Sequence, residues 1–99
     1  MTRVVLSKDA KRDLSNIFRY WSERATFKVA DRMVDEILQR FALIAKFPEV
    51  DRHSDDVSEG LLRITVGQYI IYFRKLPGKV RVLRVLHGAR DQRRAFRSE

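Results

Sequence analysis

The spacing of apolar residues changes once along this chain, and that change constrains the fold more than any other feature. From Ala10 to Ala45, apolar side chains recur every three or four residues, the spacing of one face of an α-helix. From Leu61 to His87 they alternate with polar residues or form short runs, as in β-strands. A helical half followed by a strand half predicts an α+β domain in which helices cover one face of a sheet.

The first half predicts one short strand and two helices. Arg3–Leu6 is β-branched and apolar and predicts a strand, and Ser7 follows it at the N-cap position of a helix over residues 8–24. Thr26 is the predicted N-cap of a second helix, which should end near Phe47 because a proline comes next. The short link between the helices predicts an antiparallel hairpin.

The second half predicts three strands joined by tight turns. Leu62–Val66 alternates, Tyr69–Arg74 is almost continuously apolar, and Val80–His87 alternates again. Gly67-Gln68 and Pro77-Gly78 have the composition of two-residue turns. Strict alternation in the last strand would place four residues on one face: Val80, Val82, Arg84 and Leu86.

These elements combine into a single domain spanning residues 1–99. The predicted order is β-α-α-β-β-β, with a mainly antiparallel sheet packed on the helical hairpin. Residues 49–60 are expected to form a polar loop, and residues 89–96 a short helix or a frayed tail. The sheet face away from the helices would carry arginines and tyrosines, with Tyr69 and Tyr72 as stacking platforms if exposed.

Positive charge is concentrated in the second half. Residues 1–60 carry 11 Lys and Arg and 11 Asp and Glu, whereas residues 61–99 carry 10 Lys and Arg and two acids. Eight of those ten cations are arginines: Arg63, Arg74, Arg81, Arg84, Arg90, Arg93, Arg94 and Arg97. Guanidinium groups bind phosphates and carboxylates through paired hydrogen bonds, so an anionic partner is expected. The alternative is a solvated face whose charge only prevents aggregation.

His87 is the main candidate for acid–base chemistry, because an imidazole titrates near neutral pH. The alternative is a histidine at the end of a strand, bonded to the backbone. His53 lies in an acidic loop and is expected to be solvated. Neither histidine has neighbours at metal-ligand spacing, so no metal site and no cofactor are predicted. There is no cysteine, and no leader or membrane-spanning stretch, so a cytoplasmic location is expected.

Large apolar side chains on the two helices are numerous for a chain of this length. Most should be core, and the surplus would form a groove for a partner peptide. The residues expected along this groove are Leu14, Phe18, Trp21, Met33 and Ile37.

Three segments carry a family resemblance: Leu61–Arg63, Tyr69–Arg74 and Val82–Asp91, which reads VLRVLHGARD. Together with the β-α-α-β-β-β order over just under 100 residues, they resemble the RelE/ParE toxin superfamily, and within it ParE. The resemblance covers essentially the whole chain.

The resemblance implies the toxin of a type II toxin–antitoxin module that stabilises a plasmid or chromosome and inhibits growth. ParE-like toxins inhibit DNA gyrase by binding, without chemistry of their own. A ParD-like ribbon-helix-helix antitoxin neutralises them in a heterotetramer or larger complex, which meets operator DNA only through the antitoxin; no membrane is involved. The residues expected to meet the target are Arg84, His87, Arg90, Arg93 and Arg94. Those expected to meet the antitoxin are the five groove residues with Arg63 and Arg74.

Two alternatives remain open. The RelE branch cleaves mRNA on the ribosome, and here His87 with Arg63, Arg81 and Arg84 would supply such a nuclease site. That branch has a tyrosine soon after the last strand, whereas this chain reads RDQRRAF over residues 90–96, which favours ParE. The other alternative is a degenerate toxin kept only for complex formation and autoregulation.

Overall fold

The computed structural model describes residues 2–47, 52–53 and 60–88. The elements are β1 (Arg3–Leu6), α1 (Lys8–Arg24), α2 (Phe27–Lys46), β2 (Arg52–His53), β3 (Leu62–Val66), β4 (Tyr69–Leu76) and β5 (Lys79–His87). The α+β class is confirmed, and one short strand is added. β2 lies within the predicted polar loop and pairs antiparallel with β3. Residues 89–96, the possible terminal helix, lie outside the described residues.

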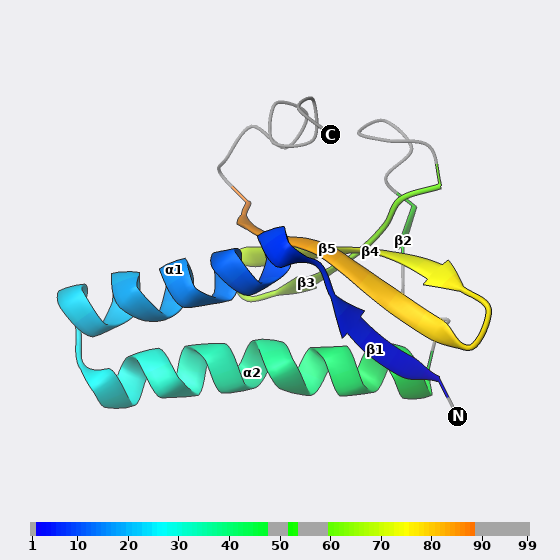
Figure 1. The fold of residues 1–99 in the computed structure, drawn as a ribbon. Coiled ribbons are helices and arrows are strands. Elements are labelled where there is room, and N and C mark those ends of the chain that lie inside the picture. The colour runs from blue at the N-terminus through cyan, green and yellow to red at the C-terminus, as the bar shows by residue number, and fades with distance from the viewer. Residues whose placement is uncertain (1, 48–51, 54–59, 89–99) are drawn as a thin grey trace.

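Both helices begin at the predicted N-caps. The Ser7 hydroxyl accepts a hydrogen bond from the Ala10 amide at 3.0 Å, and the Thr26 hydroxyl accepts one from the Val29 amide at 3.1 Å. Each satisfies an amide that has no partner within its helix. Because only two residues link the helices, they run antiparallel beneath the sheet (Figure 1).

The sheet has the strand order β1-β5-β4-β3-β2. β5, β4, β3 and β2 are antiparallel neighbours, whereas β1 pairs parallel with β5, so the sheet is mixed. Gly67 and Gly78 have φ angles of 57° and 71° in the two predicted turns. Residues with a Cβ adopt this left-handed region reluctantly, which explains glycine there.

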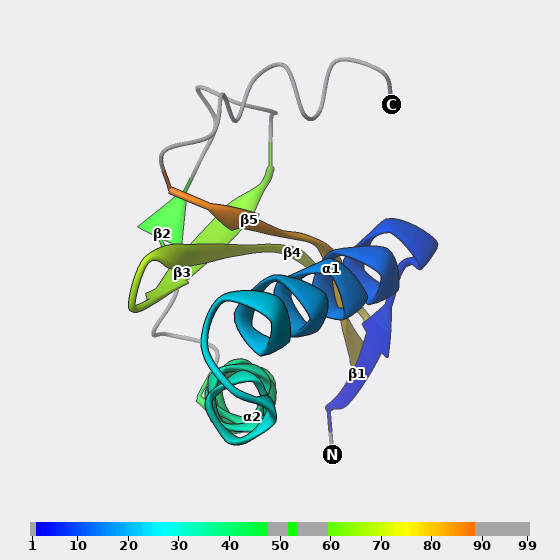
Figure 2. The same ribbon diagram turned by 90° about the vertical axis from the view of Figure 1, so that its left-hand side faces the viewer.

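The main core lies between the sheet and the helices. α1 lies against the sheet beside β5, and α2 packs below it (Figure 2). The fully buried side chains of this core include Ala10, Ile37, Ile44, Ile71, Phe73, Val80 and Val82. The second face of the sheet, here called the outer face, carries a smaller buried cluster of Leu61, Tyr72 and Leu86.

A bulge in β5 breaks the predicted alternation. Val82 pairs with Phe73 and Arg84 pairs with Tyr72, so Leu83 is an extra residue without a partner across the ladder. Val82 and Val85 therefore both reach the helix-side core, and Leu86 reaches the outer cluster. The prediction that Val82, Arg84 and Leu86 share a face was wrong for this reason.

Candidate functional site

The predicted site residues fall in separate places. His87 ends β5, Arg84 lies where β5 meets α1, and Arg63, Arg74 and Arg81 lie on the outer face. The remaining predicted target-binding residues, Arg90, Arg93 and Arg94, lie outside the described residues, as does Arg97.

His87 is held in a small cluster at the end of β5. Its ring packs edge-to-face on Tyr69, its partner across the ladder, with 5.6 Å between ring centroids. Its Nε2 lies 3.1 Å from the Gln68 side-chain oxygen, which can only accept, so this nitrogen donates. The Tyr69 hydroxyl accepts a hydrogen bond from the Trp21 indole at 2.9 Å. Helix α1 thus positions Tyr69, and Tyr69 with Gln68 positions the imidazole.

Two cavities border this cluster. One, of about 390 Å³, lies between α1 and the ends of β4 and β5 and is lined by Asn16, Ile17 and Tyr20 among others. The other, of about 400 Å³, lies over the β3–β4 turn. Both are lined by Tyr69 and His87, so the exposed imidazole stands between two hollows large enough for a side chain.

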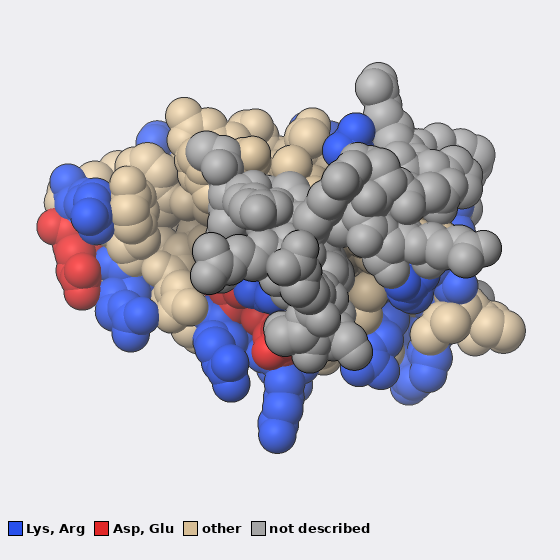
Figure 3. Space-filling view, turned by 90° about the horizontal axis from the view of Figure 1, so that it is seen from above, with Lys and Arg blue, Asp and Glu red and all other residues tan. Residues whose placement is uncertain are grey.

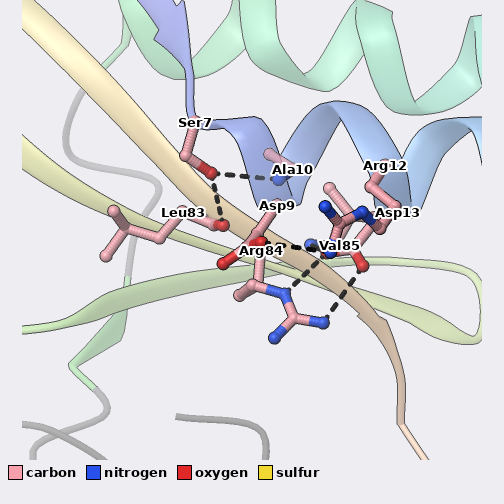
Figure 4. Close-up of polar contacts among 8 residues, drawn as sticks. All are labelled: Ser7, Asp9, Ala10, Arg12, Asp13, Leu83, Arg84 and Val85. Carbon is pink, nitrogen blue, oxygen red and sulfur yellow. Dashed lines mark hydrogen bonds and ion pairs between the residues drawn. The ribbon is translucent and has the colours of Figure 1, made fainter. Parts of the chain in front are cut away.

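Arg84 is bound to an aspartate of α1 (Figure 4). Its Nε donates to Asp13 Oδ2 at 2.8 Å, and its Nη2 donates to Asp13 Oδ1 at 3.1 Å. Only 13% of the Arg84 side chain and 8% of the Asp13 side chain are exposed. Arg84 therefore joins β5 to α1, which corrects its prediction as part of the exposed target-binding surface.

The same helix completes the edge of β5 beyond the end of β1 (Figure 4). Asp13 Oδ2 accepts a hydrogen bond from the Val85 amide at 2.9 Å. The Ser7 hydroxyl, which caps α1, donates to the Leu83 carbonyl at 2.7 Å. Asp13 and the cap residue Ser7 thus satisfy backbone groups of β5 that a neighbouring strand would otherwise satisfy. Sequence reasoning missed Asp13, although a carboxylate between Ala10 and Ile17 on the apolar helix face was a signal.

The outer face carries cations on three adjacent strands. Arg63 on β3 alternates with core residues, as do Arg74 on β4 and Arg81 on β5, so all three face away from the helices. Figure 3 looks onto this side of the molecule and shows Lys and Arg along its margin, with some Asp and Glu among them. Tyr72 shares the face but is fully buried, and Tyr69 faces the helices with 5% exposed. Neither tyrosine is an exposed stacking platform.

The residues predicted for a nuclease are not brought together. His87 contacts Tyr69 on the helix side, whereas Arg63 and Arg81 lie on the outer face. Arg81 and His87 are six residues apart on one strand, about 20 Å at the rise of a β-strand. Arg84 is engaged by Asp13. Within the described residues, no histidine and arginine of this set converge on one phosphate position.

The predicted antitoxin-binding residues lie on the helices but differ in access. Leu14, Trp21 and Met33 are partly buried and pack against the main core, and Phe18 packs edge-to-face on Phe27. Ile37 is 1% exposed, so it is core and its prediction as a surface residue is corrected. The exposed apolar side chains of the hairpin, which sequence reasoning did not separate from the core, are Tyr20, Phe27 and Leu38.

No metal or membrane feature is found in the part of the chain that the structure describes. Its His, Cys, Asp and Glu side chains form no group of three that would hold a metal ion. Among the described helices, none has both the length and the apolar character needed to span a bilayer.

Comparisons with known proteins find ParE and RelE toxins. The model of the "ParE toxin of type II toxin-antitoxin system, parDE" matches residues 4–92. Toxin ParE3 of Caulobacter vibrioides is 30% identical over 88 residues, which cover 89% of this chain and 88% of the relative. Toxin RelE3 of the same organism is 31% identical over 89 residues, which cover 89% of this chain and 96% of the relative.

Solved structures share the fold. A chain of the chromosomal ParDE system from P. aeruginosa superposes with a TM-score of 0.77 at 16% identity, over 88% of this chain and 96% of the other. A chain of the RelBE2 toxin–antitoxin complex from Mycobacterium tuberculosis gives a TM-score of 0.66 at 21% identity, over 87% and 96%.

Proposed function

The chain belongs to the ParE family of type II toxins, and from this premise we propose that it stops replication by inhibiting DNA gyrase. The observation that carries the proposal is the family match over residues 4–92. The dispersal of the predicted nuclease residues supports it, because a binding inhibitor needs no convergent acid, base and cation.

The second candidate is a ribosome-dependent mRNA endonuclease of the RelE type. The 31% identity to Toxin RelE3 favours it. An exposed His87 with neighbouring cavities is also compatible with a proton-transfer group. Against it, Arg84 is tied to Asp13, and Arg63 and Arg81 lie on the other face of the sheet from His87. A nuclease site would have to be completed by other groups.

We also propose that a ParD-like antitoxin neutralises the toxin. Its ribbon-helix-helix part would bind operator DNA, and its acidic tail would pack on the helical hairpin beside Leu14, Phe18 and Trp21. The exposed Tyr20 and Phe27 extend that surface. Arg63 and Arg74 lie on the opposite side of the sheet, so a tail that reached them as well would have to pass around its edge. The complex would be a heterotetramer or larger in the cytoplasm.

A supercoiling assay with purified toxin tests the target. We expect wild-type toxin at micromolar concentration to inhibit gyrase and to leave mRNA intact on translating ribosomes. His87→Gln replaces the imidazole with an amide that still donates a hydrogen bond but cannot act as an acid or base, so gyrase inhibition should fall by no more than the loss of one contact.

The nuclease candidate makes the opposite prediction. It expects cleaved transcripts with the wild-type toxin and loss of that cleavage in His87→Gln, with gyrase unaffected by either protein. That pattern would replace gyrase inhibition with the nuclease function.

A further inference from the structure

A row of aromatic side chains connects helix α1 to the imidazole of His87. The Trp21 indole donates a hydrogen bond to the Tyr69 hydroxyl at 2.9 Å, and the Tyr69 ring packs edge-to-face on His87. We call Trp21, Tyr69 and His87 the aromatic row. Trp21 also packs edge-to-face on Tyr20, with 5.2 Å between ring centroids, and Tyr20 is 43% exposed. Contacts therefore continue from an exposed residue of the hairpin to the end of β5.

The hydrogen bond from Trp21 determines where the Tyr69 side chain lies. Tyr69 is 5% exposed, and a hydroxyl that has been taken out of water destabilises the fold unless it has a hydrogen-bond partner. The two cavities at this end of the sheet are both lined by Tyr69, so its ring has space into which it could turn. The indole N–H therefore holds the hydroxyl against α1 and keeps the ring in contact with the imidazole.

The position of Tyr69 affects His87 because the two residues are partners across the β4–β5 ladder. The sheet fixes their backbones, so the remaining freedom lies in the side chains. Two contacts restrict the imidazole: the Tyr69 ring, with 5.6 Å between centroids, and the Gln68 side-chain oxygen, 3.1 Å from Nε2. An exposed side chain that is already held in one orientation loses less entropy when a partner binds it. The aromatic row thus pre-organises an exposed hydrogen-bonding group.

We propose that Trp21 is a positioning residue for target binding: it holds Tyr69, and Tyr69 holds His87 in the orientation that meets the target. Trp21 does this through the hydrogen bond to Tyr69 and without contacting the target itself. This inference rests on the proposed function, in which His87 contacts gyrase. It gives Trp21 a role beyond packing on the core and beyond the antitoxin contact expected from the sequence.

The tautomer of His87 is the first measurement, because it reports on the imidazole directly. Long-range proton–nitrogen correlation spectra of the purified toxin, recorded with the imidazole neutral, distinguish a proton on Nε2 from one on Nδ1, and His87→Gln assigns the signals by their loss. The wild type should show the Nε2–H form that the contact with Gln68 requires. Tyr69→Phe removes only the hydroxyl, and Trp21→Phe removes the donor. Each should move the signals towards a mixture of the two tautomers.

Ser22→Ala is the matched control for these variants. It removes a hydrogen bond of the neighbouring residue on α1, from the Ser22 hydroxyl to the Arg19 carbonyl at 3.0 Å. The control should leave the His87 signals and gyrase inhibition unchanged. A mixture of tautomers already in the wild type, unchanged signals in both Tyr69→Phe and Trp21→Phe, or an equal change in Ser22→Ala would each overturn the positioning role.

The supercoiling assay tests whether the orientation of His87 matters for the target. Trp21→Phe should raise the toxin concentration for half-maximal inhibition by about two- to tenfold, the cost of ordering one side chain on binding. In a His87→Ala background the same substitution should have no further effect, because the group that it positions is gone. Trp21→Phe and Tyr69→Phe remove the same hydrogen bond, so the double variant should lose no more than the larger single loss. An equal factor in both backgrounds would show that Trp21 does not act through His87.

The two measurements separate this inference from the proposed function. If the wild-type toxin does not inhibit gyrase, the proposed function fails and the role of Trp21 in target binding fails with it, whereas the tautomers still decide whether Trp21 positions His87. If the wild type inhibits gyrase and His87→Ala inhibits it equally well, gyrase inhibition stands and the role of Trp21 in target binding is overturned.

Discussion

At the scale of single residues, the Asp13–Arg84 pair is the contact on which the helix–sheet interface most depends. The carboxylate accepts two hydrogen bonds from the guanidinium and one from the Val85 amide. A buried ion pair is weak evidence for net stability, but removing one partner leaves the other charged and desolvated. The effect of substituting one residue of the pair on stability therefore depends on whether the other is still present.

We predict that Asp13→Asn and Arg84→Gln will each destabilise the toxin by about 3–5 kcal/mol, because each leaves a buried charge or donor unmatched. The double variant should cost less than the sum of the two, since neither charge remains buried. Urea unfolding of the four proteins measures the coupling.

The exposed pair Asp9–Arg12 is the matched control, with a 3.8 Å contact and both side chains accessible to water. The same cycle there should give a coupling below about 0.5 kcal/mol. Similar coupling energies for the two pairs would show that burial does not set the strength of Asp13–Arg84.

At the scale of elements, α1 is both a helix and the continuation of the sheet edge. The hydroxyl of its N-cap residue Ser7 accepts a hydrogen bond from the Ala10 amide and donates one to the Leu83 carbonyl. One hydroxyl therefore joins the start of the helix to the bulged part of β5. Thr26 caps α2 in the same way but is exposed and contacts only its own helix. A comparison of the two caps therefore distinguishes the stability gained from local capping from the stability gained from a tertiary hydrogen bond.

We predict that Thr26→Ala will cost about 1 kcal/mol, the usual loss of an N-cap. Ser7→Ala should cost about 1–2 kcal/mol more, because it also leaves a partly buried carbonyl without a donor. Equal changes in the free energy of unfolding for the two variants would rule out the tertiary contribution of Ser7.

Most elements were predictable from the sequence because their signals are local. The two caps, the turn glycines and the apolar periodicity each act within a few residues, and α1 begins and ends where predicted.

The bulge at Leu83 was not predictable, since an extra residue in a run of strand-forming residues has no local signature. The role of Arg84 was missed because its partner lies 71 residues away, on α1. The exposed His87 was placed correctly at the end of the last strand, but the Gln68 contact that fixes its ring depends on the β3–β4 turn.

At the scale of the whole molecule, the two faces of the sheet carry different kinds of residue. The helix side carries the core and, on the outside of the hairpin, the exposed apolar residues Tyr20, Phe27 and Leu38. The outer face carries the cations Arg63, Arg74 and Arg81. A partner that binds the native toxin stabilises it by mass action, by an amount set by the partner's free concentration relative to Kd.

We predict that the C-terminal segment of the cognate antitoxin will raise the melting temperature of the toxin. At a free concentration 100 times Kd the gain is about 2.7 kcal/mol, which corresponds to several degrees for a domain of this size. Tyr20→Ser with Phe27→Ser should reduce the rise if the hairpin is the binding surface, whereas Leu76→Ser, which removes an exposed apolar residue at the β4–β5 turn, should not. An unchanged rise in the hairpin variant would place the antitoxin elsewhere.

The parallel pairing of β1 with β5 also orders events during synthesis. Among the described elements β1 comes first in chain order, and its neighbour in the described sheet is β5, which comes last. The hydrogen bonds of Ser7 with Leu83 and of Asp13 with Val85 likewise cannot form until β5 has been synthesised. Until β5 emerges, the nascent chain holds a helical hairpin without the strand against which α1 mainly packs. Because contacts of such long sequence separation form late, a ribosome that stalls before Lys79 releases a chain without the folded sheet.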